Sequence, residues 1–353
     1  MTRRSEEQAT APDSGVEPAS ATAEVNMELF EARLREKSGL NYRVHNLSRA
    51  SSGHSNATWL ASAAPCDLAI KFQSVPSSVH ERAPNMEPAI LTHLAAQGAR
   101  VPRVLAIDED TTRFGAPWFA MNRIPGNGIP DDADTGYMVD GWFANASSKR
   151  RSSIWRSFIE ALASVHRAPL DGLDASRGGS TSGLLDYLRA ACDDASADAF
   201  PRTHRLLDHF ARVLPCDADD EPSVCMGDAR LANALVEGER VSGLVDFEIS
   251  FLGHPAADVG YAINHHRYLE HNSGVQLSGI PHADETWKLW EGLTHRRVSR
   301  EDRKFWEAFG GLIILVTANR VIWQTIAPDL PDGVSPEDVN PLLAFTENAL
   351  ERS

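Results

Sequence analysis

One predicted β-hairpin constrains the fold of this chain more than any other feature. Two short apolar runs, residues 234–236 and 241–245, flank a polar segment, residues 237–240, that contains a glycine. This pattern predicts two antiparallel strands joined by a tight turn. A hairpin brings its two outer ends together. Asn233, before the first strand, and Asp246, after the second, are therefore expected to lie side by side.

The polar residues around this hairpin form a pattern that suits phosphoryl transfer. Asp228 precedes Asn233 by five residues, which is the Asp-x-x-x-x-Asn spacing of the protein-kinase catalytic loop. A phosphoryl group in transfer carries dispersed negative charge, so catalysis depends on positioning and on neutralisation by Mg²⁺. Mg²⁺ prefers oxygen ligands, which Asp246 and the Asn233 amide can supply. Asp228 is then left to accept or orient the proton of a substrate hydroxyl.

Several segments in the same order resemble the aminoglycoside phosphotransferase (phosphotransferase enzyme) family, a branch of the protein-kinase-like fold. The strongest of them reads Gly-Asp-x-x-x-x-Asn at residues 227–233, followed by Asp-Phe-Glu at residues 246–248. The similarity extends over residues 40–320. The other matching segments are residues 52–58, 100–105, 119–126 and 253–260.

The resemblance implies where a nucleotide binds. Lys71, on an Ala-Ile-Lys strand, would hold the α- and β-phosphates, and Glu87 would pair with it. Pro88 follows Glu87 directly and fits only the first turn of a helix, so Glu81 is the alternative partner. The phosphate loop would lie near Gly53, and backbone groups of residues 121–123 would contact the adenine. The implied nucleotide-binding set is Ser52, Gly53, Ser55, Asn56, Lys71, Glu87, Met121, Asn122 and Arg123.

The resemblance also implies how the chemical step is divided. Asp228 would be the catalytic aspartate, with Asn233 and Asp246 as the Mg²⁺ ligands. Asp258 would brace the catalytic loop. Arg230, inside that loop, would contact a carboxylate or phosphate of the substrate, or form a salt bridge within the loop. The implied reaction moves the γ-phosphate of ATP or GTP to a hydroxyl of a small molecule, with Mg²⁺ as cofactor.

The hydrophobic pattern predicts two lobes after a tail. Residues 1–25 lack periodicity and are rich in Ser, Ala, Thr, Glu and Pro, which indicates disorder. Residues 26–123 read as strands with one helix, and residues 124–353 as mainly helical around the hairpin. We expect an α+β, protein-kinase-like fold. Its N-terminal lobe, an antiparallel sheet plus a helix, would bind nucleotide, and its helical C-terminal lobe would carry the catalytic loop and substrate pocket.

Composition and charge exclude several classes of partner and location. A net charge of −15 argues against nucleic acid. The longest apolar run, residues 310–316, is too short to span a membrane, and the N-terminus does not read as a signal peptide. Four cysteines without CxxC spacing predict no disulfide framework or zinc site. His265, His266 and His271 fit no metal-ligand spacing and are expected at the surface. We expect a cytoplasmic monomer or homodimer.

The sequence leaves the phosphate acceptor open. The family name suggests an antibiotic such as an aminoglycoside or a macrolide. A cationic aminocyclitol would favour nearby carboxylates, for which the run from Asp217 to Glu221 is the candidate. The Gly-Asp-Ala-Arg loop also resembles relatives that look like kinases of hydroxyacyl-CoA or other metabolic alcohols. Basic residues 149–151 would then bind the CoA phosphates.

Two functions of other classes are alternatives. One is a nucleotide-binding pseudokinase, which would bind Mg²⁺ and nucleotide without turnover. The other is a metal-dependent hydrolase, which would have no need of Lys71. The preference between ATP and GTP is also left open.

Overall fold

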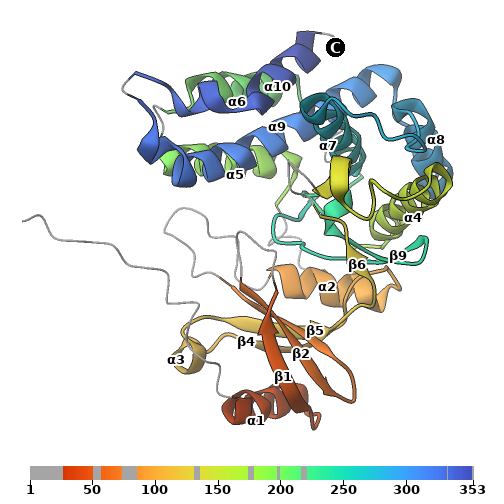
Figure 1. Ribbon diagram of the computed structural model, residues 1–353, viewed down its shortest axis with the longest axis vertical. Coiled ribbons are helices and arrows are strands. Elements are labelled where there is room, and N and C mark those ends of the chain that lie inside the picture. The colour runs from red at the N-terminus through yellow and green to blue at the C-terminus, as the bar shows by residue number, and fades with distance from the viewer. Residues whose placement is uncertain are drawn as a thin grey trace, which may run out of the picture. The chain divides into compact units, whose positions relative to one another are not determined.

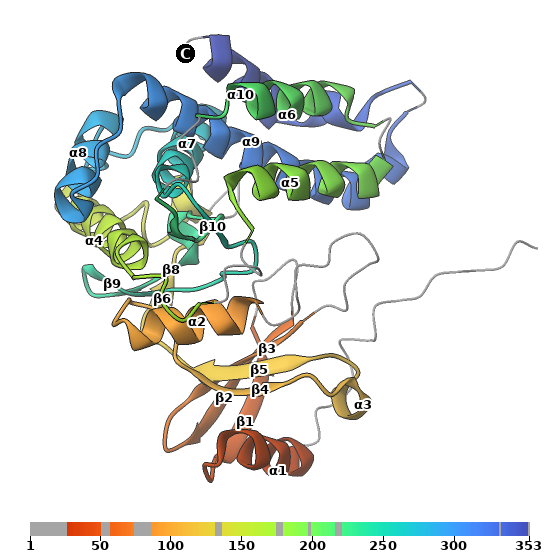
Figure 2. The ribbon, with the colours of Figure 1, turned by 180° about the vertical axis from the view of Figure 1, so that it is seen from behind.

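The computed structural model (Figures 1 and 2) describes residues 27–50, 57–73, 86–130, 136–173, 179–196, 199–215, 221–331 and 333–351. Several predictions fall outside these ranges. They concern the tail at residues 1–25, the acidic residues before Glu221, and Ser52, Gly53, Ser55, Asn56 and Glu81.

The chain divides into two compact units. Unit 1 comprises Met1–Val75 and Ala106–Ala120, and unit 2 comprises Pro76–Leu105 and Met121–Ser353. Unit 2 includes helix α2 (Met86–Ala96), which the sequence places among the strands of a first lobe.

A five-stranded sheet has the order β1-β2-β3-β5-β4. Neighbouring strands β1, β2 and β3 pair antiparallel, and Lys71 on β3 lies opposite Thr58 on β2. The sheet with its helices confirms the α+β, kinase-like class that the sequence predicts. The strands are β1 (Arg43–Arg49), β2 (Ala57–Ala64), β3 (Leu68–Phe72), β4 (Val104–Asp108) and β5 (Trp118–Asn122).

Helix α1 (Met27–Ser38) is tied to unit 1 by an ion pair and by aromatic packing. Arg33 donates to both oxygens of Asp108, at 2.5 and 2.9 Å, and the Asp108 side chain is fully buried. Phe30 packs against Trp118 with ring centroids 5.1 Å apart. Next to these contacts, the short helix α3 (Thr111–Phe114) is N-capped by Asp110, whose side chain accepts from the Thr112 amide.

Unit 2 contains the predicted hairpin. Strands β8 and β9 pair antiparallel from Ala234 opposite Leu244 to Glu237 opposite Arg240, as expected. Two shorter pairings were not predicted, because strands of two or three residues leave no periodic signal. Strand β6 joins β8 as a third strand, and β7 pairs with β10. The strands are β6 (Asn127–Gly128), β7 (Ser223–Cys225), β8 (Ala234–Glu237), β9 (Arg240–Leu244) and β10 (Phe251–Gly253).

Helices make up most of unit 2. Helix α4 packs against β9 and α8, while α5, α6, α9 and α10 lie side by side in both views (Figures 1 and 2). The amphipathic pattern at residues 154–165 is confirmed as the buried face of α4. The helices are α4 (Ser148–His166), α5 (Thr181–Ser196), α6 (Pro201–Val213), α7 (Ala256–Ser273), α8 (Ala283–Thr294), α9 (Arg300–Thr325) and α10 (Pro341–Glu351), with a π-helical turn η1 (Gly136–Asp140) and 3₁₀ turns η3 (Leu231–Asn233), η4 (Ala327–Asp329) and η5 (Pro336–Val339).

Helices α7 and α9 approach each other so closely that two glycines are needed. A Cβ at Gly260 would lie 2.1 Å from the Trp306 carbonyl oxygen, and one at Gly310 would lie 2.5 Å from the Tyr261 Cα. Helix α9 is long and apolar enough to cross a membrane, yet 67% of its most apolar window is buried inside the structure. The pair therefore forms a tightly packed core that sets the position of α7.

We expect Gly260→Ala to lower the free energy of unfolding by about 1–3 kcal/mol, because the new methyl group must push two helix backbones apart. Urea unfolding monitored by circular dichroism measures the change. Gly292→Ala on α8 is the matched control, since its Cβ would meet nothing within 4 Å and alanine favours a helix by about 1 kcal/mol over glycine. Equal effects of the two substitutions would contradict the packing argument.

Candidate active site

The loop that carries Asp228 is held by the carboxylate of Asp258. The backbone amides of Met226 and Gly227 donate to the two Asp258 oxygens at 2.7 and 2.9 Å, and Asp258 is fully buried in the first turn of α7. A carboxylate that accepts two backbone N–H groups is among the stronger hydrogen-bonded pairs. This contact confirms that Asp258 braces the loop.

A histidine and a tryptophan continue this contact into the core. His166 Nε2 lies 3.0 Å from Asp258 Oδ2, and Trp290 Nε1 donates to His166 Nδ1 at 2.9 Å. Because Nδ1 accepts a hydrogen bond, the ring proton of a neutral His166 is on Nε2, where it is donated to Asp258. His166 is thus a packing residue at the end of α4, with Asp258 and Trp290 as its partners.

Backbone conformation at Gly227 and Asp246 shapes the two ends of the site. Gly227 has φ +81°, and a Cβ there would lie 2.4 Å from the Ile249 carbonyl oxygen, so only glycine fits. Asp246 has φ +70° without being a glycine. Such a left-handed aspartate is uncommon and costs free energy that the surrounding structure must offset. The chain therefore places this carboxylate in an unfavourable local conformation.

The Asp228 carboxylate is held on both oxygens. The Tyr261 hydroxyl donates to Oδ1 at 2.5 Å, and Arg230 Nε lies 3.2 Å from Oδ2. Only 14% of the Asp228 side chain is exposed. Arg230 therefore forms the salt bridge within the loop, one of the two roles considered from the sequence. Tyr261 was missed, because only the fold brings α7 against this loop.

Burial raises the pKa of Asp228 above its ordinary value of 3.8, and the nearby Asp246 carboxylate raises it further. Arg230, the hydrogen bond from Tyr261, and His265 each act in the opposite direction on this pKa. Burial outweighs them, since removing a carboxylate from water disfavours its charged form. Asp228 thus holds its proton more readily than an exposed aspartate does.

Asn233 is fixed by the same loop. Its side-chain Nδ2 donates to the Asp228 carbonyl at 3.0 Å, and its own carbonyl accepts from the Val245 amide at 2.9 Å. The second bond joins the two ends of the hairpin, so Asn233 and Asp246 are brought together as predicted. Among the residues that the structure describes, no three His, Cys, Asp or Glu side chains gather to hold a metal.

Glu87 contacts the residue after Asp246. Its Oε1 accepts from the Phe247 amide at 3.1 Å, and its side chain is buried on α2. Helix α2 is therefore linked to the Asp-Phe-Glu segment. Lys71 is also buried, with 5% exposed, on β3 of unit 1. Its pairing with Glu87 stays a prediction, because the two residues belong to different units.

The segment expected to contact adenine forms the end of β5. The Asn122 amide donates to the Arg103 carbonyl, and the Asn122 side chain accepts from the Arg103 amide at 2.6 Å. The amide hydrogen of Asn122 is therefore engaged within the protein. Met121 is buried and Arg123 is exposed.

His265, His266 and Arg151 do not lie at the surface as expected, whereas His271 is exposed as predicted. His265 and His266 are each only 7% exposed rather than at the surface. His265 stacks on Tyr261, with ring centroids 6.1 Å apart, and so lies beside Asp228. Arg151 is buried and donates to backbone carbonyls, and Arg150 donates to the Gly238 carbonyl. The Arg151 guanidinium serves the fold, which removes it as a CoA-phosphate ligand, whereas Lys149 and Arg150 stay predictions.

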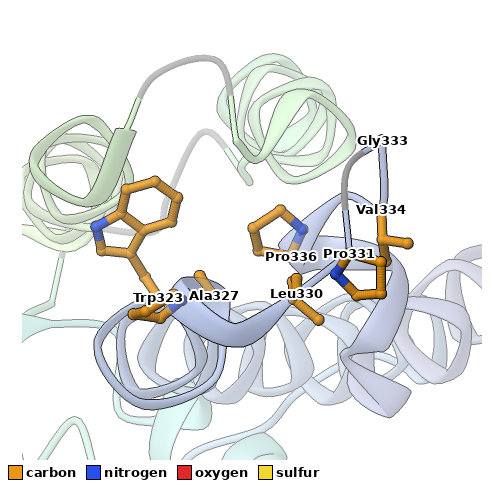
Figure 3. A pocket seen from close by; sticks show the side chains of 8 residues that line it. Trp323, Ala327, Leu330, Pro331, Gly333, Val334 and Pro336 are labelled. Atoms are coloured by element: carbon orange, nitrogen blue, oxygen red, sulfur yellow. The ribbon is translucent and has the colours of Figure 1, made fainter.

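A cavity of about 430 Å³ lies at the far end of α9 (Figure 3). None of its described lining residues is charged, and Trp323 and Pro336 face it from opposite sides. Trp323 is thirteen residues beyond Gly310, which corresponds to about 20 Å along the helix. The cavity is therefore separate from the Asp228 loop. Its lining residues are Trp323, Ala327, Pro328, Leu330, Pro331, Gly333, Val334 and Pro336.

Residues 46–295, more than half of the chain, match the phosphotransferase enzyme family. The chain belongs to this family, as the sequence motifs predicted. The family is described as one of phosphotransferase enzymes.

Solved structures are similar to this chain in fold. A provisionally assigned aminoglycoside phosphotransferase from Ralstonia eutropha JMP134 is similar with a TM-score of 0.67 and 21% identity, over 92% of this chain and 98% of that one. Spectinomycin phosphotransferase APH(9)-Ia in complex with ADP and spectinomycin is similar with a TM-score of 0.57 and 13% identity, over 93% and 100%. At these identities the likeness concerns the fold.

The proteins similar in sequence include members of the acyl-CoA dehydrogenase family by name. The chain is 27% identical to acyl-CoA dehydrogenase family member 10 of Mus musculus, over 67% of this chain and 23% of that protein. It is 26% identical to the human acyl-CoA dehydrogenase family member 11, over 55% of this chain and 25% of that protein. The chain thus spans about a quarter of the length of these relatives.

We expect Asp258→Ala to lower the free energy of unfolding by about 3 kcal/mol or more, because two buried amides lose their acceptor. Urea unfolding measures it. Asp186→Ala, at an exposed position on α5, is the control and should change stability by less than about 0.5 kcal/mol. A similar small effect at Asp258 would show that the loop does not depend on it.

Asp228→Asn should not destabilise the protein at neutral pH. Because the folded-state pKa of Asp228 is raised, the unfolded chain releases this proton first, and ionisation lowers stability as pH rises above about 4. Asparagine has no such penalty. The unfolding free energy of the variant minus that of the wild type, measured without metal or nucleotide, should therefore be larger at pH 7 than at pH 4. A loss of stability that grows with pH would contradict the raised pKa.

Proposed function

We propose that this protein is a cytoplasmic, Mg²⁺-dependent kinase that moves the γ-phosphate of ATP or GTP to a hydroxyl of a small metabolite. The observation that carries the proposal is the Asp228 carboxylate, which is largely buried, held by Tyr261 and Arg230, and adjacent to the joined ends of the β8–β9 hairpin.

Asp228 is suited to act on the acceptor hydroxyl. A general base is most effective when its pKa lies nearer the working pH than that of an exposed carboxylate, and burial moves the pKa of Asp228 in that direction. Its orientation is fixed before any substrate binds, because both oxygens already have partners. The carboxylate would accept the hydroxyl proton as the oxygen attacks the phosphoryl group.

Asn233 and Asp246 fit a Mg²⁺ site by the chemistry of their donor atoms. The Nδ2 of Asn233 is committed to the Asp228 carbonyl, which leaves the amide oxygen as the atom to face a cation. Asp246 contributes a carboxylate from a strained backbone position. One carboxylate and one amide oxygen, completed by phosphate oxygens and water, is a usual Mg²⁺ set. When bound, the ion would neutralise charge on the phosphates.

The nucleotide-binding residues follow from the family resemblance. We propose that Lys71 holds the phosphates and that Met121 or Arg123 contacts the base, since the Asn122 amide is engaged with Arg103. The spectinomycin enzyme with ADP and the APH(4)-Ia enzyme with AMP-PNP have the same fold. A nucleotide as the phosphate donor of this chain is consistent with both.

For the acceptor we propose a hydroxyacyl-CoA or a similar anionic alcohol. Arg230 brings a positive charge and Tyr261 a hydrogen-bond donor to the Asp228 carboxylate, and the Asp246 carboxylate lies nearby. Glu221, the described member of the acidic run, is exposed and lies 3.8 Å from Arg296. The sequence relatives are named as acyl-CoA enzymes. A CoA ester would need phosphate ligands other than Arg151, for which Lys149 and Arg150 are the candidates.

An antibiotic is the second candidate, because the structures of similar fold include enzymes bound to spectinomycin and hygromycin B. The deciding experiment is Mg²⁺-dependent release of nucleoside diphosphate against hydroxyacyl-CoAs, aminoglycosides, macrolides and nucleoside antibiotics, with ATP and GTP as donors. We expect the hydroxyacyl-CoA arm to stimulate release. Stimulation by the antibiotics alone would overturn the proposed acceptor class.

Asp228→Ala should lower turnover by about 10²-fold or more, because it removes the proposed base, while nucleotide affinity changes little. Turnover and isothermal titration with nucleotide measure the two effects. Near wild-type turnover in this variant would refute the role of Asp228. Nucleotide binding by the wild type without turnover of any acceptor would instead favour a pseudokinase.

Asp246→Ala should remove most of the Mg²⁺ dependence of nucleotide affinity, because the proposed carboxylate ligand is lost. Titrations of ATP with and without Mg²⁺ measure this dependence. Glu248→Ala, at the same loop but outside the proposed ligand pair, is the control. If Asp246→Ala and Glu248→Ala respond alike, Asp246 does not bind the metal.

A further inference from the structure

We infer that Tyr261 is a positioning residue for Asp228, and that helix α7 sets the catalytic loop through two contacts on one face. The inference rests on the proposed role of Asp228. It adds a residue that neither the motif spacing nor the family resemblance pointed to.

The two contacts come from one turn of α7. Asp258 binds the Met226 and Gly227 amides, and Tyr261, three residues later, donates to Asp228. Residues three apart lie on the same face of a helix. The loop is therefore fixed twice by one rigid element, first through its backbone before Asp228 and then through the Asp228 side chain. A shift of α7 would move both contacts together.

Tyr261 itself has little freedom. Its backbone lies against Gly310 of α9, where a Cβ would come within 2.5 Å of the Tyr261 Cα. Its ring stacks on His265, with an interplanar angle of 14°, and only 3% of the residue is exposed. The phenol oxygen is thus restricted to one position, 2.5 Å from Asp228 Oδ1. A donor held in this way fixes the carboxylate plane as well as its position.

The consequence for the reaction is geometric. With Oδ1 bound by Tyr261 and Oδ2 facing Arg230, the carboxylate cannot rotate freely about its last side-chain bond. A hydroxyl acceptor then meets a base whose lone pairs already point in a defined direction. Reactions of this kind lose rate steeply when a catalytic group is misaligned. Tyr261 should therefore affect turnover much more than substrate binding.

The test compares Tyr261→Phe with Tyr268→Phe in the full-length protein. Tyr268 lies on the same helix, and its ring packs against Phe345 instead. Release of nucleoside diphosphate is measured in two ways. One uses the acceptor that stimulates release in the panel described under the proposed function, and the other uses Mg²⁺–ATP alone, with water as the acceptor. We expect Tyr261→Phe to lower kcat about ten- to a hundred-fold with the nucleotide KM within about twofold. Tyr268→Phe should leave both unchanged.

A double-mutant cycle separates positioning from general stability. In the Asp228→Asn background, Tyr261→Phe should cause no further loss of kcat, because the group that it positions is already absent. Equal losses in both backgrounds, or a nucleotide KM that rises as much as kcat falls, would overturn the inference.

A measurement without turnover keeps the inference separate from the proposed function. Hydrogen–deuterium exchange of the peptide covering residues 226–233 should accelerate in Tyr261→Phe and not in Tyr268→Phe, while other peptides stay unchanged. Unchanged exchange in this peptide would overturn the positioning role. If the wild-type protein phosphorylates no acceptor and the exchange effect is present, the proposed function fails and the positioning by Tyr261 stands.

Discussion

The carboxylate of Asp258 is the contact on which the site depends. It accepts the backbone amides of Met226 and Gly227 and is itself contacted by His166, whose far nitrogen accepts from Trp290. An unpaired carboxylate would be costly in this buried place, so its partners and the loop conformation stabilise one another. The position of Asp228, one residue later, follows from that arrangement.

The helical core of unit 2 supports this contact from behind. Helices α7 and α9 pack so closely at Gly260 and Gly310 that α7 has one available position. Since α7 carries both Asp258 and Tyr261, the packing of two helix backbones determines where the Asp228 carboxylate points. The left-handed Gly227 and Asp246 then direct the chain on either side of the hairpin.

The sequence predicts those parts of the site that depend on local spacing. The β8–β9 hairpin was readable from two apolar runs and a turn, and with it the proximity of Asn233 and Asp246. Contacts between elements distant in the chain were not readable. Tyr261 donates across thirty-three positions, and His265 looked like one of several surface histidines. The basic residue Arg151 was misread, because charge alone does not reveal that a guanidinium is satisfied by backbone carbonyls.

Asp258 recognises the main chain of the loop and no side chain in it. Any residue except proline presents the same N–H group at position 226. A contact of this kind tolerates sequence divergence, because side chains of the loop can be replaced without changing the backbone hydrogen bonds to Asp258. The geometry of the base can thus be inherited while acceptor preference drifts. That is one physical route by which proteins 13–21% identical come to share one fold.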